Sequence, residues 1–254
     1  MFISYRRADA VALAEQLFEE FSEAGFDVFL DRFRGTPGRS FPTLLNEFLM
    51  DKGLVLVIES PQVDQSQWTL AEVRFAMMYQ LGLLTITMPG GKRFSSIRPR
   101  DRYAPSTHWD PVSPCTAKTV LTDTGIKELI AFVRRRYAVQ IVKRRAYLDT
   151  LLVTALARHG IASTLLNGLR LIANGPGYVI ESSARPPGLE QIRRARQAAS
   201  LRQSCAVVVG PASYLPPYKQ TDLKWLVGAV GVHHAEETAV TRLARQISSG
   251  STLP

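Results

Sequence analysis

The residue with the strongest case for chemistry is Glu72, an acid that follows a buried strand and a loop. The run at 54–58 (LVLVI) is short, apolar and rich in β-branched residues, which predicts a strand buried on both faces of a parallel sheet. Pro61 marks a loop, and a segment that starts near Trp68 then carries Glu72. Ligands of open parallel sheets bind beyond the carboxyl ends of the strands, so we expect Glu72 at the rim of a crevice. A carboxylate there could stabilise a positive charge that develops on a bound ligand.

An aromatic residue and three arginines could complete such a site. Trp68 precedes Glu72 by four positions, which places both side chains on one helix face. Arg6 and Arg7 follow the first predicted strand, and Arg34 lies on a loop rich in Gly and Pro after the second. Guanidinium groups bind phosphate oxygens in bidentate fashion, so these arginines could hold a pyrophosphate.

Each of these residues also has a purely structural explanation. An acid near the start of a helix can be there for its favourable interaction with the helix dipole. Trp68 could be a core anchor instead of a pocket wall, and Arg6 and Arg7 could simply be solvated. The sequence leaves these alternatives open.

Strands and helices alternate along the first half and must position these residues. The predicted strands cover 2–5, 26–30, 54–58 and 83–88, and the predicted helices cover 11–25, 40–50, a segment from Trp68, and 122–136. This alternation implies right-handed crossovers and a parallel sheet with helices on both faces. We therefore predict an α/β, doubly wound domain over residues 1–136.

The second half repeats motifs of the first. VQIVKRRA at 139–146 resembles FISYRRA at 2–8, and the arginines of these two motifs are 138 residues apart. Three later matches share one offset of 150 residues: Val28 with Tyr178, Pro37 with Pro187, and Glu72 with Asp222. About a dozen extra residues are therefore expected within 160–177. We predict a second, degenerate copy of the same fold over residues 137–254.

The composition is that of an ordinary globular chain, with 46% hydrophobic and 21% charged residues. Two well-separated cysteines without metal-ligand spacing indicate a reducing compartment and no metal site, and the histidines form no triad or metal set. The start MFISYRR has no charged segment followed by an apolar core, so we expect no signal peptide. No apolar run reaches the roughly 18 residues of a membrane helix. We expect a cytoplasmic protein without a membrane partner.

The charge balance points to phosphate-bearing ligands. Lys plus Arg number 31 against 22 Asp plus Glu, which gives a net charge of +9. The basic residues occur in pairs and triplets and do not alternate with aromatic residues on one helix face. This pattern argues against nucleic acid as a partner and favours a solvated basic surface.

Four motifs in order resemble the Toll/interleukin-1 receptor (TIR) domain of the bacterial type: FISYRR, GFDVFLD, RGTPGRSF and SQWTLAE. The catalytic motif of that family, Ser-x-Trp-Cys-x-x-Glu, is matched by Ser66, Trp68 and Glu72, with Thr69 in place of the cysteine. The resemblance covers about residues 1–136 and implies a flavodoxin-like fold. Residues 137–254 resemble the family only through the internal repeat.

The resemblance implies cleavage of the bond between nicotinamide and ribose in NAD⁺, by hydrolysis or cyclisation, with Glu72 as the catalytic residue. Nicotinamide is already a cationic leaving group, so one carboxylate that stabilises an oxocarbenium-like transition state suffices. NAD⁺ would be the substrate, with no further cofactor. The implied substrate-binding residues are Phe2, Ser4, Arg6, Arg7, Asp31, Arg34, Ser66 and Trp68.

Further implications concern the loop and the second copy. Asp31 could end its strand or bind a ribose, and the loop that carries Arg34 could be a plain connection or could complete a neighbour's active site on self-association. Asp222 and Tyr218 stand where Glu72 and Trp68 do, but Asp is one methylene shorter, so we expect a structural copy for assembly or partner contact.

The family resemblance also suggests a biological setting, a Thoeris-like role in bacterial antiphage immunity in which a separate protein detects infection. Two alternatives stay open. One is a non-enzymatic adaptor that acts through contacts between TIR domains, and the other is a nucleotide or nucleoside N-glycosidase that uses the same carboxylate.

Overall fold

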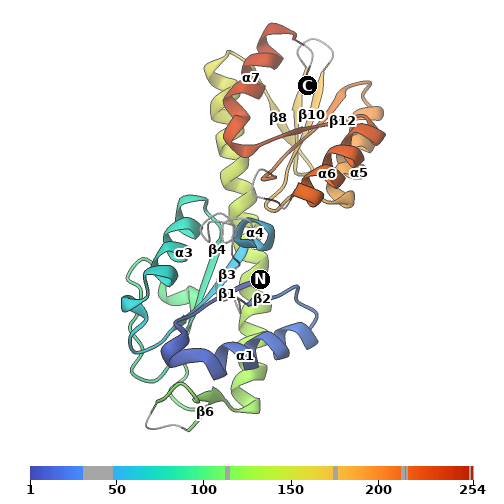
Figure 1. Ribbon diagram of the computed structural model, residues 1–254. Coiled ribbons are helices and arrows are strands. Elements are labelled where there is room, and N and C mark those ends of the chain that lie inside the picture. Colours follow the sequence, from blue (N-terminus) through green and yellow to red (C-terminus); the bar gives the residue numbers. More distant parts are fainter. Residues whose placement is uncertain are drawn as a thin grey trace. The chain divides into compact units, whose positions relative to one another are not determined.

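The computed structural model describes residues 1–30, 48–111, 115–173, 177–212, 215, 217–251 and 253. The chain divides into two compact units, Met1–Ile141 and Val142–Pro254 (Figure 1). Their boundary lies inside one long helix, α4, which spans Asp123–Arg158. The boundary expected after residue 136 falls in the same helix. The predicted end of that helix at 136 is wrong, because it continues for several further turns.

Unit 1 is built on a parallel five-stranded sheet in the order β2-β1-β3-β4-β5. The strands are β1 (Phe2–Ser4), β2 (Phe29–Leu30), β3 (Leu54–Glu59), β4 (Gly82–Thr87) and β5 (Arg102–Tyr103). Every residue of β3 is buried, as expected for a central strand without polar alternation. The four predicted strands are thus confirmed, with shorter ends at β1 and β2.

Helices cover both faces of this sheet. They are α1 (Arg7–Glu23), α3 (Gln67–Met78) and the first part of α4, with short 3₁₀ turns η1 (Val63–Gln65) and η2 (Pro99–Asp101). The strand residues Ile3, Leu56 and Ile86 form one core with α1 and α4, so the alternate residues of these strands face the opposite side, toward α3. A small antiparallel pair, β6 (Trp109–Asp110) and β7 (Val120–Leu121), completes the unit. The doubly wound prediction is confirmed here.

Unit 2 contains a mixed five-stranded sheet in the order β12-β11-β10-β9-β8. Its strands are β8 (Thr164–Leu166), β9 (Leu169–Ile172), β10 (Tyr178–Ser182), β11 (Cys205–Val209) and β12 (Val232–Ala235). Strands β10, β11 and β12 are parallel, whereas β9 runs antiparallel to β10 and β8 antiparallel to β9. The remaining elements are α5 (Leu189–Ser200), α6 (Pro217–Val230), η3 (Glu237–Ala239) and α7 (Val240–Ser249).

Two apolar cores sandwich the sheet of unit 2. The end of α4 and α7 pack on one face, and α5 and α6 pack on the other (Figure 1). The described residues contain no helix long and apolar enough to span a membrane.

The expected internal repeat is matched only in the alternation of strands and helices from β10 to β12. Residues 139–146, predicted to repeat the first strand, belong to α4, so that match is wrong. β10 pairs directly with β11, whereas β1 lies between β2 and β3, the strands expected to match them. The prediction of a second, wholly parallel sheet is also wrong, because β9 runs antiparallel to β10 and β8 runs antiparallel to β9. The extra residues expected within 160–177 contain the hairpin of β8 and β9.

Candidate functional site

Glu72 lies on the face of α3 that packs against the sheet. The buried residues of this helix include Thr69, Glu72, Val73 and Ala76, which recur at helical spacing. Glu72 is 5% exposed. The sequence placed this carboxylate at the rim of an open crevice, whereas the structure buries it between α3 and the sheet.

A hydrogen bond connects Glu72 to the end of the first strand. Ser4, the last residue of β1, is 1% exposed, and its hydroxyl donates to Glu72 Oε2. Ser4 alternates with Ile3, so its side chain points to the α3 face of the sheet. The two residues, 68 positions apart in sequence, therefore meet beside the carboxyl end of a parallel strand, where ligands of such sheets bind.

Ser66 caps the helix that carries Glu72. Its Oγ accepts hydrogen bonds from the backbone N–H of Thr69 at 3.2 Å and from Thr69 Oγ1 at 3.0 Å. Capping of this kind satisfies a backbone donor that the first helical turn leaves unpaired. Thr69, which stands where the motif has a cysteine, is fully buried. Ser66 and Thr69 thus fix where α3 begins and how Glu72 is presented.

Trp68 points away from the core, with 53% of its surface exposed. The alternative of a core anchor is therefore wrong. Trp68 and Glu72 lie one turn apart, but only Glu72 is covered by the sheet. Phe2 shows the opposite outcome: its ring is fully buried and stacks on Phe29 with centroids 5.4 Å apart. Packing in the core therefore explains the aromatic residue at position 2.

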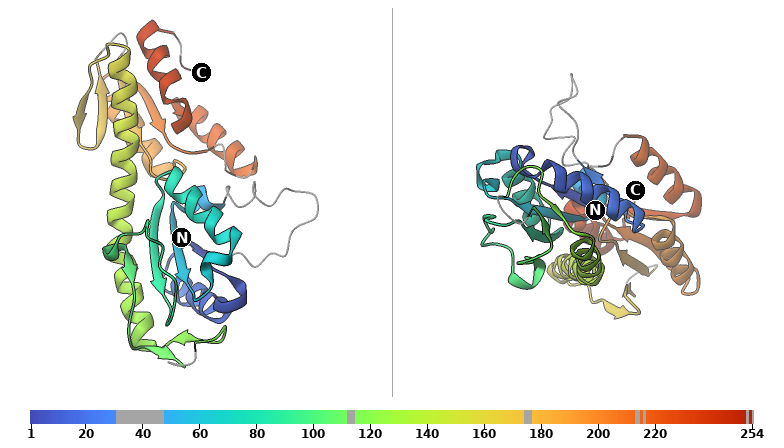
Figure 2. Two further views of the ribbon diagram at one scale, coloured as in Figure 1. Left: turned by 90° about the vertical axis from the view of Figure 1, so that its left-hand side faces the viewer. Right: turned by 90° about the horizontal axis from the view of Figure 1, so that it is seen from below.

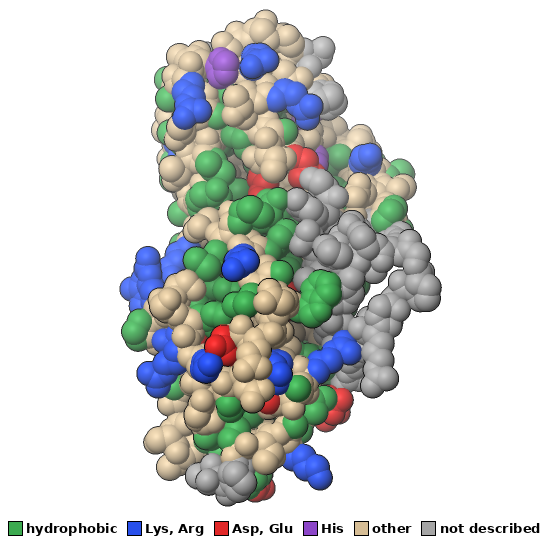
Figure 3. All heavy atoms as spheres, turned by 60° about the vertical axis from the view of Figure 1, so that its left-hand side comes forward, with side chains coloured by type: hydrophobic (Ala, Val, Ile, Leu, Met, Phe, Trp, Pro, Cys, Tyr) green, Lys and Arg blue, Asp and Glu red, His purple; other side chains and the backbone are tan. Residues whose placement is uncertain are grey.

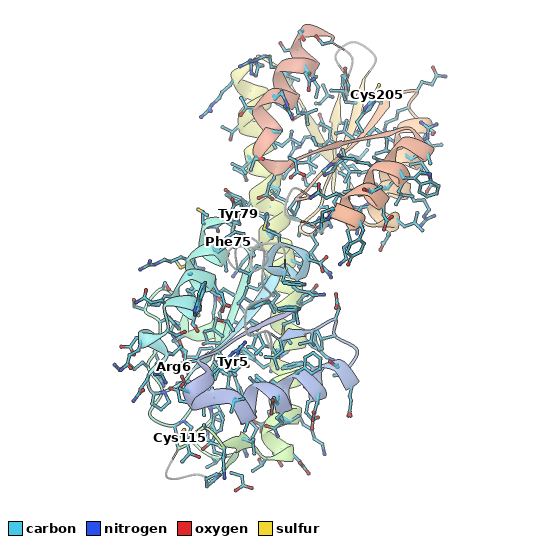
Figure 4. All side chains as sticks on the ribbon, viewed as in Figure 1. Tyr5, Arg6, Phe75, Tyr79, Cys115 and Cys205 are labelled. Atoms are coloured by element: carbon cyan, nitrogen blue, oxygen red, sulfur yellow. The ribbon has the colours of Figure 1, made fainter. Side chains whose placement is uncertain are left out.

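Arg6 links the end of β1 to the loop after β3. Its Nη1 lies 3.5 Å from Asp9 Oδ1, and Asp9 Oδ2 accepts a hydrogen bond from the backbone N–H of Gln62 at 3.0 Å. Figure 4 shows Arg6 beside Tyr5 at the start of α1. Arg7 is exposed in the first turn of the same helix. Asp31, Arg34 and the Gly/Pro loop lie outside the described residues.

The comparisons with known proteins bear on this unit. Residues 1–99 match the family model described as the TIR domain. Residues 1–99 are a TIR domain. The match covers less than half of the 254 residues, and it does not reach unit 2.

No curated protein matches the chain. Among solved structures, it is similar to the TIR domains in the activated Roq1 resistosome directly recognizing the pathogen effector XopQ, a plant assembly. That match has 22% identity and a TM-score of 0.31, and it covers 34% of this chain and 55% of that chain. The chain thus spans about half the length of that solved protein.

A second buried acid in the TIR domain was missed by the sequence reasoning. Glu59 ends β3, is fully buried, and pairs with Arg102 through Nε–Oε2 and Nη2–Oε1 distances of 2.8 and 3.0 Å. Thr87 Oγ1 and the backbone N–H of Phe94 also donate to it, at 2.5 and 2.8 Å. The sequence did contain a signal for this residue, because Glu59 directly follows the apolar run at 54–58. With these partners Glu59 holds the loops after β3 and β4 together.

Unit 2 holds no copy of the Ser4–Glu72 arrangement at the positions that the repeat predicted. Tyr218 is 64% exposed and Asp222 is also exposed, both on α6. One buried acid among the described residues of unit 2 is Glu181, at 1% exposure, which pairs with Arg145 of α4 and Arg194 of α5. Burial raises the pKa of Glu181, and the two guanidinium groups oppose this shift.

Unit 2 also contains a small pocket. A pocket of about 100 Å³ lies between β12 and α7 in unit 2, lined by residues that include His233, Arg242 and Gln246. Within the described part of the chain, no three His, Cys, Asp or Glu side chains gather as metal ligands would. On the face shown in Figure 3, Lys and Arg side chains are spread among hydrophobic ones instead of forming one stripe.

Proposed function

We propose that the TIR domain cleaves the nicotinamide–ribose bond of NAD⁺ with Glu72 as the catalytic carboxylate. The observation that carries this proposal is the buried Glu72, hydrogen-bonded to Ser4 beside the carboxyl end of β1. A carboxylate in a weakly polar environment interacts strongly with a nearby cation. The ribose carries developing positive charge as nicotinamide leaves, and nicotinamide needs no general acid.

Substrate contact requires a movement of the site. Glu72 is 5% exposed, so NAD⁺ reaches its carboxylate only after α3 or its surroundings shift. We propose that self-association of TIR domains supplies this shift, with the loop that bears Arg34 completing the neighbour's site. Arg6 and Arg7 would bind the pyrophosphate, Asp31 the ribose on the adenine side, and exposed Trp68 would form the outer wall. Water attack gives ADP-ribose, and attack by an internal nucleophile gives a cyclic product.

The setting that we propose is antiphage defence in the bacterial cytoplasm, similar to Thoeris systems. A separate protein would detect infection, and unit 2 would serve assembly or partner contact.

The decisive experiment incubates the protein with NAD⁺ at high protein concentration and separates the products by chromatography. Glu72→Gln keeps an oxygen that can accept from Ser4 but removes the charge, so nicotinamide release should fall about a hundredfold or more. Glu19→Gln, the same change at an exposed position of α1, is the matched control and should keep the wild-type rate. Wild-type turnover by Glu72→Gln would remove this mechanism.

A specific observation favours the adaptor as a second candidate. α3 exposes the adjacent Met77 and Met78 at its carboxyl end, at 42% and 66%, and neighbouring exposed apolar side chains occur in protein contact surfaces. An adaptor would release no nicotinamide even when associated, and substitution of Met78 by Lys would abolish its association. Release of free base from nucleosides, but not from NAD⁺, would instead identify an N-glycosidase.

A further inference from the structure

The hairpin of β8 and β9 forms one edge of the sheet in unit 2. Asn167 and Gly168 connect the two strands with φ values of 51° and 76°, the left-handed conformations of a tight two-residue turn. β8 is the last strand of the sheet order within the described residues, and Figure 2 shows the hairpin at the outer border of its unit. One side of β8 therefore presents backbone N–H and C=O groups that β9 does not pair.

Apart from its short length of three residues, this edge lacks the usual protection against strand pairing. Proteins commonly protect an exposed edge with charged residues, proline or a bulge. Residues 160–168 (GIASTLLNG) contain no charged residue and no proline. All three residues of β8 are exposed, including Leu165 at 54% and Leu166 at 43%. The edge combines unpaired backbone groups with exposed leucines on both faces of the strand.

The neighbours of β8 make each of its faces suitable for a partner strand. Leu166 is opposite Leu169, which is 7% exposed, so a strand added beside Leu166 would extend an existing apolar surface. Leu165 is opposite Arg170 on the other face, and Arg170 is paired with Asp149. The charge opposite Leu165 on β9 is therefore already paired within the chain.

We propose that β8 pairs antiparallel with β8 of a second copy of this chain, joining the two sheets across a two-fold axis. An edge strand that pairs antiparallel with itself is self-complementary, as a two-fold interface requires. With the axis at Leu165, this residue faces its own copy, and Thr164 faces Leu166. The chain carries a net charge of +9, so two copies repel each other. Because β8 has no charged side chain, pairing along β8 places no like charges opposite each other. A charged peptide would find no side-chain charge on β8 to recognise.

The pairing should be weak and reversible. β8 has three residues, and an interface below about 1,200 Å² is typical of transient association. It extends the sheet of unit 2 and uses no residue of the TIR domain. The inference is independent of the proposed NAD⁺ chemistry, so Glu72→Gln protein should pair like the wild type.

Disulfide trapping in the full chain tests this geometry. In a Cys115→Ser/Cys205→Ser background, Leu165→Cys should form a disulfide dimer on mild oxidation, because opposite Cα atoms of antiparallel strands are about 4.5–5.5 Å apart. Leu201→Cys, at the end of α5 and 78% exposed, is the matched control. Pairing raises the effective thiol concentration, so Leu165→Cys should cross-link roughly a hundredfold faster than the control.

The register gives a second readout. Thr164→Cys and Leu166→Cys proteins should cross-link when mixed, and each alone should do so much more slowly. Equal cross-linking rates for Leu165→Cys and Leu201→Cys, or no product specific to the mixture, would overturn the proposal. Because Leu165 is exposed and outside both cores of unit 2, its substitution should leave the fold intact, which the circular dichroism spectrum checks.

Discussion

The hydroxyl of Ser4 donates a hydrogen bond to Glu72 Oε2 and so ties the end of β1 to the buried face of α3. Both residues are at most 5% exposed, and the bond joins a neutral donor to an acid in a place that water barely reaches. It fixes the orientation of the one side chain on which the proposed chemistry depends.

Ser4→Ala should therefore change both stability and activity. The loss of a buried hydrogen bond to a carboxylate costs about 1.5–3 kcal/mol in the free energy of unfolding. Nicotinamide release should also fall, because the carboxylate is no longer held. Urea unfolding and the NAD⁺ assay measure the two effects. Ser22→Ala removes a hydroxyl that donates to Phe18 O on an exposed helix surface, and it should change both little. Equal stability of the two variants would contradict this account.

The Glu59–Arg102 pair should be a strong polar determinant of stability in unit 1. Its side chains are 0% and 9% exposed, so removal of either partner leaves a buried charge. We expect Glu59→Ala or Arg102→Ala to lower the free energy of unfolding by about 3–5 kcal/mol. Asp64→Ala breaks the exposed Lys92–Asp64 pair and should cost about 0–1 kcal/mol.

Tryptophan fluorescence can follow this unfolding. Trp225→Phe removes the one tryptophan of unit 2, so the signal of Trp68 and Trp109 reports on unit 1. If Glu59→Ala lowered the free energy of unfolding as little as Asp64→Ala does, the Glu59–Arg102 pair would not be a major source of stability.

Arg144 in unit 2 should be replaceable only together with its partner. It is fully buried and donates through Nη2 to Glu237, while its Nε and Nη1 have no hydrogen-bond partner. Arg144→Met leaves Glu237 buried without a counter-charge and should cost about 3–5 kcal/mol. Arg144→Met/Glu237→Leu should recover most of this loss. Hydrogen exchange of unit 2 in urea measures the difference, and a double variant as unstable as the single one would contradict the pairing.

The same pair predicts a pH dependence. Burial raises the pKa of Glu237 above its ordinary value, and Arg144 opposes the shift. A raised pKa in the folded state means that the contribution to stability is full below the pKa of an unfolded glutamate. It is lost as the pH rises through the folded-state pKa. Arg144→Met removes the opposing charge, so its stability should fall more steeply with rising pH than that of the wild type. Curves of stability against pH that run parallel for Arg144→Met and the wild type would contradict this prediction.

Cys115 should react with alkylating agents at higher pH than an ordinary thiol. Burial raises its pKa, the charge of Asp9 adds to this, and a hydrogen bond with Thr119 opposes it. The thiolate is the reactive form, so the midpoint of the rate against pH should lie above about 8.5. Iodoacetamide labelling of Cys205→Ser protein, followed by mass spectrometry, gives this midpoint. Urea-unfolded protein is the control, and coincident midpoints would contradict the shift.

Local patterns made part of the fold predictable. The apolar run before Glu59 indicated β3, because burial of a strand leaves a trace within a few residues. The segment 139–146 misled because it was assigned from its sequence match to 2–8. A match of a few residues does not fix secondary structure, and this segment lies inside α4 with Val139 and Val142 exposed.

The sequence by itself determined the alternation of strands and helices in the TIR domain, and it singled out Glu72 and Ser66 within one motif. These features depend on neighbouring residues along the chain. Tertiary structure decided that Glu72 is buried against Ser4, that Trp68 faces solvent, and that the sheet of unit 2 is mixed. Such features depend on which strands pair and which helix covers them. Residues 68 positions apart must first be brought together before a hydrogen bond between them can exist.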